Sequence, residues 1–126
     1  MTTTEVPAEI VRVDIDGRRR VVLVPSAAVT LSGASAEVKG LLHVVVTFAG
    51  ESTVHYYTIL VESWTAEADA DEIKQKVGRV LEKAKEKAKE YARAIWAVRE
   101  LGAEISFKDG VANRSWLPTW LQRYLE

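Results

Sequence analysis

The sequence contains no cysteine, which excludes disulfide bonds, thiolate nucleophiles and cysteine-ligated zinc sites. It also has a single asparagine, two glutamines and no methionine after position 1. Charged residues make up 28% of the chain. A low number of thermolabile residues together with many charged residues is typical of hyperthermophile proteins. The irregular stretch 25–36 and the four tryptophans are not the choices of an idealised design. We therefore expect a natural protein from a thermophile.

An excess of charge of either sign is also lacking, because 17 Lys and Arg residues face 18 Asp and Glu residues, for a net charge of −1. This balance excludes the binding of duplex nucleic acid by bulk positive charge. The longest run without charge, residues 21–36, contains Pro25 and Gly33 and is too short for a membrane span. The first residues have neither the basic nor the apolar segment of a secretion signal. The sequence thus predicts a cytoplasmic protein that does not contact a membrane.

Familiar catalytic motifs are missing as well. The sequence has no nucleophile elbow, no phosphate-binding glycine loop and no dinucleotide fingerprint. Its two histidines, His43 and His55, are predicted to lie on opposite faces of a sheet, with no third metal ligand evident. We therefore predict no catalytic residues, no bound metal and no organic cofactor. An enzyme with an unrecognised carboxylate site is kept as the third hypothesis for function.

The first part of the chain has the pattern of a β-hairpin. Apolar and charged residues alternate up to the pair Asp16-Gly17, with the period of a half-buried strand. This pair favours a tight turn, after which a second strand would return and place Arg19 opposite Asp14. Pro25 is expected to end that strand, because proline cannot donate a hydrogen bond to a ladder.

A stronger hairpin signal follows over residues 40–64, which are rich in Val, Ile, Thr and Tyr around a glycine turn. A turn of even length would place Val46 opposite His55. One face of the hairpin then has the composition of a core: Leu42, Val44, Val46, Phe48, Tyr57, Ile59 and Val61. The opposite face, which includes His43 and Tyr56, mixes apolar and polar side chains.

The apolar period changes from 2 to 3.6 near residue 65 and predicts one long helix that ends at Leu101. Asp69 and Glu72 have the spacing of a capping box, and Gly102 suits the position after the helix. At roughly 50 Å, the helix would exceed a ten-residue strand of about 33 Å. Part of its apolar stripe would then be free to contact a partner. The predicted oligomer interface comprises Val77, Val80, Ala84, Ala88, Tyr91 and Ile95.

The C-terminal segment is rich in leucine and aromatic residues, and Pro118 suits the first turn of a short helix over 119–125. The segment either closes the core of its own chain or serves as an aromatic anchor at an interface. The candidate anchor residues for a partner are Trp116, Trp120 and Tyr124.

The densest basic cluster is Arg18-Arg19-Arg20 at the tip of the predicted first hairpin. A solvated tip with ordinary charge pairing explains this cluster. The alternative interpretation is an anion or nucleic-acid contact, in which His43 and Tyr56 would stack on the bases of a single strand beside the arginines.

These patterns together predict a single α+β domain over residues 1–126, in which residues 1–8 are a polar tail. The domain has an antiparallel sheet of about five or six strands packed on one long helix, with a short C-terminal helix. The leading hypothesis for function is a non-enzymatic accessory or scaffold protein that associates with itself as a dimer or larger oligomer, and further with another protein. The runner-up is a single-stranded nucleic-acid-binding protein.

Overall fold

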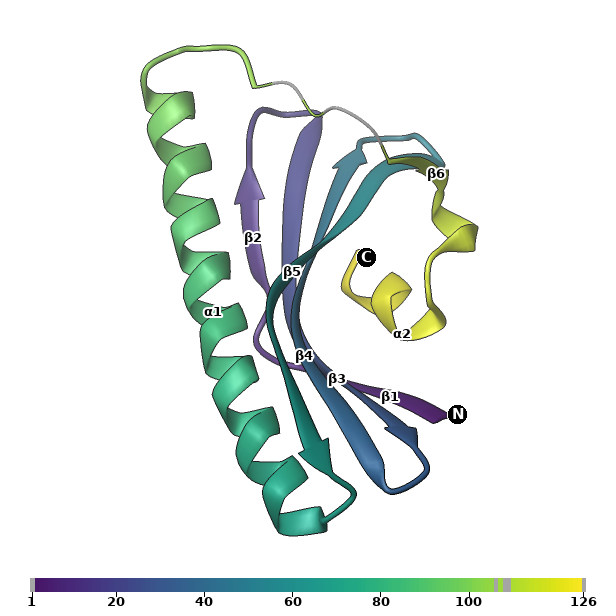
Figure 1. Cartoon of the computed structure of the whole chain (residues 1–126). Coiled ribbons are helices and arrows are strands. Elements are labelled where there is room, and N and C mark those ends of the chain that lie inside the picture. The colour runs from purple at the N-terminus through teal and green to yellow at the C-terminus, as the bar shows by residue number, and fades with distance from the viewer. Residues whose placement is uncertain (1, 106, 108–109, 126) are drawn as a thin grey trace.

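Three long antiparallel strands form the centre of the computed structural model, which describes residues 2–105, 107 and 110–125 (Figure 1). They are β3 (Arg19–Ser32), β4 (Ser35–Phe48) and β5 (Thr53–Glu67), joined in sequence by two short turns. Gly33 and Gly50 occupy these turns with φ values of 61° and 77°, which favour glycine. The abundance of β-branched residues explains why this part of the chain extends into strands.

Shorter strands complete the sheet. β1 (Thr2–Pro7) and β2 (Val11–Asp14) pair one after the other with the same edge of β3, and β6 (Val111–Asn113) pairs with the start of β5. The sheet therefore has six strands in the order β1-β3-β4-β5-β6, with β2 beside β3. This confirms the predicted fold class. The prediction of a polar tail over residues 1–8 is wrong, because residues 2–7 form β1, which is held in place by its pairing with β3.

Pro25 does not end β3, contrary to the sequence prediction. The carbonyl of Pro25 accepts a hydrogen bond from the Ala8 N–H at 2.8 Å, so this residue directs its polar backbone toward β1 and β2. The pairing of β2 stops at Leu23, and that of β1 begins at Ser26. The N–H that proline lacks would thus fall at the junction between the two partner strands, where no ladder hydrogen bond is lost.

The register of the second hairpin follows the prediction over most of its length. Val46 lies opposite His55, and this register persists as far as Leu41, where a bulge shifts the pairing by one residue. In the first hairpin the prediction is one residue off. Asp14 lies opposite Arg20 instead of Arg19, because the turn is longer than two residues.

The long helix α1 (Ala70–Glu100) begins after Asp69 and ends one residue before the predicted Leu101, which forms its C-cap. The Asp69 side chain makes no capping hydrogen bond, so the predicted capping box is not formed. At the other end, Gly102 has a φ of 70°, and the Ala103 N–H donates to the Val98 carbonyl, which satisfies an otherwise unpaired group of the last turn. Among the described residues, no helix is both long and apolar enough to cross a membrane.

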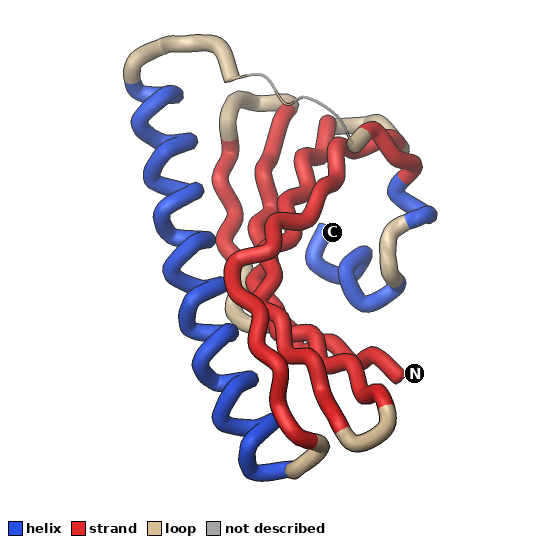
Figure 2. The backbone as a smooth tube through the Cα atoms, in the orientation of Figure 1, coloured by secondary structure: helices blue, strands red, loops and turns tan. Residues whose placement is uncertain are grey.

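The curved sheet is covered on both faces, as Figure 2 shows: α1 lies along one face, and the C-terminal segment lies on the other. The core against α1 includes Leu23, Leu42, Val44, Ala88 and Ile95. The core against the C-terminal segment includes Val22, Val24, Val45, Leu117, Leu121 and Leu125. The first face is the one that the sequence predicted to have core composition.

Candidate functional site

The residues predicted as an oligomer interface on α1 lie against the sheet of their own chain. Val80, Ala84, Ala88 and Ile95 are buried there, and Val77 and Tyr91 pack beside them. The prediction was wrong because it assumed short strands. The 31 residues of α1 span about 46 Å, and the 14 or 15 residues of β3, β4 and β5 span about 46–50 Å. The helix therefore does not outrun the sheet, and this apolar stripe is not available to a partner.

The C-terminal segment closes the second core of its own chain. It comprises a 3₁₀ turn (Arg114–Trp116), the helix α2 (Thr119–Gln122) and a second 3₁₀ turn (Arg123–Leu125). Of the three predicted anchor residues, Trp120 and Tyr124 are half-buried and pack against the sheet. Trp116 is 76% exposed, so it alone of the three presents its side chain to a partner.

His43 lies beneath this segment in a chain of hydrogen bonds. Its Nε2 is 3.0 Å from Glu5 Oε2, and its Nδ1 is 3.0 Å from the Tyr56 hydroxyl and 3.2 Å from Thr58 Oγ1. An ionised Glu5 can only accept, so Nε2 donates to it. The Trp120 ring contacts the imidazole at an interplanar angle of 76°, with ring centroids 5.3 Å apart.

The His43 cluster has the composition of an acid–base site but the environment of a structural one. His43 is only 3% exposed, and both of its ring nitrogens already have partners in the protein. The hydrogen bond from His43 is the largest of the effects that lower the pKa of Glu5 below its ordinary value. Desolvation of the carboxyl acts in the opposite direction and is outweighed. The cluster therefore fastens β1, which carries Glu5, to the centre of the sheet.

The predicted basic cluster lies at the β2–β3 turn, where acidic residues pair with two of its members. Arg20 Nε is 2.8 Å from Asp14 Oδ1, and Arg19 Nε is 3.1 Å from Asp16 Oδ2. Asp16 also accepts the backbone N–H groups of Arg18 and Arg19, each at 2.8 Å. These backbone hydrogen bonds, led by that of Arg18, lower the pKa of Asp16.

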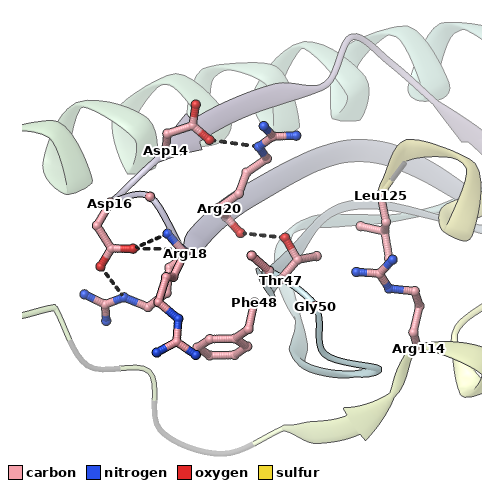
Figure 3. Close-up of a pocket in the computed structure, with 12 residues that line it drawn as sticks. Asp14, Asp16, Arg18, Arg20, Thr47, Phe48, Gly50, Arg114 and Leu125 are labelled. Atoms are coloured by element: carbon pink, nitrogen blue, oxygen red, sulfur yellow. Dashed lines mark hydrogen bonds and ion pairs between the residues drawn. The ribbon is translucent and has the colours of Figure 1, made fainter.

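A hollow of about 260 Å³ opens beside this turn (Figure 3). The three arginines line it together with Arg114, which comes from the far end of the chain. The turn between β4 and β5, at Ala49 and Gly50, forms another part of its wall. Sequence reasoning missed Arg114 because only the pairing of β6 with β5 brings this residue to the hollow, and no local pattern records that pairing.

His43 and Tyr56 do not join the arginines in this site. Neither residue lines the hollow, and the Tyr56 ring stacks on His43 with centroids 6.0 Å apart. The predicted platform for nucleic-acid bases beside the basic cluster is therefore not formed. In addition, no group of three or more metal-ligating side chains occurs within the described part of the chain.

The outer edge of β5 is a further feature that the sequence did not predict. β6 pairs only with Thr53–His55, and the Tyr56 N–H then donates to the Gly110 carbonyl at 2.8 Å. Over residues 57–65, no described residue bonds to the outer edge of the β5 backbone. Figure 1 shows β6 beside only one end of β5. Comparison of the chain with family models, curated proteins and solved structures gives no match.

Proposed function

We propose that the protein is a non-enzymatic accessory or scaffold protein that associates with itself through the free edge of β5. The observation that carries this proposal is the row of outward backbone groups over residues 57–65 of β5, to which none of the residues that the structure describes forms a hydrogen bond. Because the Tyr56 N–H points outward to Gly110, the two-residue period of a strand directs the N–H groups of Thr58 and Leu60 to the same side. An open row of this kind is a template for another strand.

Two further features support this use of the edge. Leu60 is 56% exposed, so an apolar side chain stands next to the open backbone groups. The helix also holds β5 in place, because Lys76 and Arg79 lie over the Trp64 ring at 4.4 and 4.7 Å. A fixed edge loses little conformational freedom when a partner strand binds.

A second copy of the chain is the partner that fits this edge most simply. An antiparallel pair of identical strands related by a two-fold axis lets each β5 satisfy the other, which is the closed symmetry of most dimers. The bulge at Gly40/Leu41 limits the contact to short segments on either side. A single strand pair buries less than the ~1,200 Å² of a standard interface. We therefore expect a dimer that dissociates in the micromolar range.

Light scattering after size exclusion tests this proposal over a range of protein concentrations. We expect the wild type to have the mass of a dimer, and Leu60→Lys to have that of a monomer with an unchanged circular dichroism spectrum. A lysine on the edge blocks pairing because the second strand would have to bury its charge. Leu101→Lys is the matched control, because Leu101 is more exposed than Leu60 and lies at the end of α1.

Amide hydrogen exchange provides a second measurement. In the wild type the N–H groups of Thr58 and Leu60 should become more protected as the concentration rises, and in Leu60→Lys they should not. A wild type that stays monomeric at high micromolar concentration would overturn the proposal. So would a dimer that Leu60→Lys leaves intact.

Two features support proposals for the cellular location of the protein and for a residue through which it contacts a partner. A chain without cysteine suits a reducing compartment, and the cytoplasm is the location we propose. Trp116, with 76% of its surface exposed, is the residue we propose as an anchor for a different protein, since tryptophan is enriched at interface hot spots.

A further inference from the structure

The hollow at the β2–β3 turn has an excess of positive charge. Of the residues that the structure describes, four arginines and two aspartates line it, which gives these wall residues a net charge of +2 in a protein whose overall charge is −1. Arginines that line the same hollow repel one another, and an anion placed among them relieves this repulsion. This part of the surface therefore differs from the balanced charge of the rest of the chain.

The two aspartates do not cancel the attraction for an anion, because each is already engaged. Asp16 accepts three hydrogen bonds from Arg18 and Arg19, and Asp14 accepts one from Arg20. The net charge of +2 already includes both carboxylates, so an anion in the hollow still meets an excess of positive charge.

Two of the arginines keep their guanidinium groups available. Among the residues that the structure describes, neither Arg18 nor Arg114 forms an ion pair. The Nε of Arg114 is also buried and has no hydrogen-bond partner within that part of the chain. A buried donor without a partner costs free energy, and a ligand that accepts a hydrogen bond from it would remove that cost.

We propose that this hollow is a binding site for a phosphate group, held by Arg18 and Arg114 with Arg20 beside them. Guanidinium groups match the geometry of phosphate oxygens and bind them through paired hydrogen bonds. The net charge of +2 complements a phosphate dianion. The volume of about 260 Å³ lies below the 300–1,000 Å³ or so of pockets for drug-sized ligands. The site therefore accommodates a phosphate or pyrophosphate group and not a large organic molecule in full.

Isothermal titration calorimetry of the full chain with inorganic phosphate, pyrophosphate and adenosine monophosphate tests this site. Pyrophosphate should bind and its affinity should fall as salt is added, because the contacts are ionic. If adenosine monophosphate binds more tightly than inorganic phosphate, the natural ligand is an organic phosphate that extends beyond the hollow. If the two bind equally, it is the free anion. Either result supports the proposal and identifies the source of the phosphate.

Substitution of single arginines shows whether binding occurs in this hollow. Arg18→Gln and Arg114→Gln should each weaken pyrophosphate binding about tenfold, the effect of losing a hydrogen bond to a charged group. Arg93→Gln is the matched control, because it removes the same charge from the exposed surface of α1. Arg18 is exposed, so its replacement keeps the test valid even if Arg114→Gln fails to fold.

Three results would overturn the proposal. The first is the absence of heat with any of the phosphates at low salt. The second is an equal loss of affinity in Arg93→Gln, which would indicate attraction by overall charge alone. The third is binding of a single-stranded oligonucleotide much more tightly than pyrophosphate, which would identify a surface for a polymer instead of a pocket for one phosphate group.

Discussion

Glu5 shows how one polar contact can hold a strand in this fold. β1 is mostly exposed and polar, so its apolar contacts with the sheet are few. The Glu5 carboxylate instead accepts hydrogen bonds from His43 at 3.0 Å and from Ser26 Oγ at 3.3 Å, both of which are buried residues of the central strands. A charged acceptor strengthens such hydrogen bonds. The residues 2–7 therefore form a strand although their composition resembles that of a tail.

The depressed pKa of Glu5 predicts a pH-dependent contribution to stability. A carboxyl whose pKa is lower in the folded state stabilises the fold above its unfolded pKa, near 4.5, and loses that contribution as the pH falls through the folded value. We expect Glu5→Gln to lower the free energy of unfolding by about 1 kcal/mol at pH 6, a value reduced for partial exposure. The difference from the wild type should shrink as the pH falls through the lowered pKa of Glu5. Urea denaturation at several pH values measures it.

Glu51→Gln is the control for this experiment, because Glu51 is exposed in the turn after β4 and has no side-chain contact with His43. It should change the stability by less than about 0.5 kcal/mol at every pH. A Glu5→Gln variant that shows no pH-dependent difference from the wild type would refute the assignment of Glu5 as the residue that fastens β1.

At the scale of elements, α1 and β4 approach each other closely at Gly40. A Cβ atom at this position would lie 2.6 Å from the carbonyl oxygen of Val80 and 3.0 Å from its Cβ, so an alanine would force the helix away from the sheet. We expect Gly40→Ala to lower the free energy of unfolding by about 1–3 kcal/mol. Gly78→Ala in the same helix should raise it by about 0.5–1 kcal/mol, because no atom lies within 4 Å of the added Cβ.

Thermal and urea denaturation of the two variants give the comparison directly, since both add one methyl group. Opposite signs are the expected outcome. A Gly40→Ala variant as stable as the wild type would mean that the helix does not rest on β4 at this point.

Long elements with one clear period were predictable from the sequence. The end of α1 depends on Gly102, and the β4–β5 register depends on an even turn; both follow from local chemistry. Pro25 and residues 2–7 were mispredicted because their partners are distant. Proline is tolerated in β3 only because β1 and β2 meet beside it, and no local pattern in the sequence records that junction.

At the scale of the whole molecule, the candidate sites depended on contacts that periodicity does not reveal. The basic cluster Arg18-Arg19-Arg20 was visible as a run of charge, and the structure places it on a hollow. Arg114 reaches the same hollow from the residue after β6, more than ninety residues later in the chain. The part of the β5 edge to which no described residue bonds was also not predictable, because strand composition is the same whether a neighbour is present or absent. The sequence thus indicated which residues could bind but not which of them meet.

The C-terminal segment covers the second face of the sheet. Some of its residues belong to the core, and others are exposed and available to a partner. Leu121 is fully buried against Val22, Val24 and Val45, so Leu121→Ala leaves a cavity and should lower the free energy of unfolding by about 2–5 kcal/mol. Trp116→Ala removes a larger side chain that is 76% exposed, and it should change stability by less than about 0.5 kcal/mol. Urea denaturation of both variants measures this contrast. If Leu121→Ala costs no more than Trp116→Ala, the segment does not close the core; if Trp116→Ala costs as much as Leu121→Ala, Trp116 belongs to the core and is not an anchor for a partner.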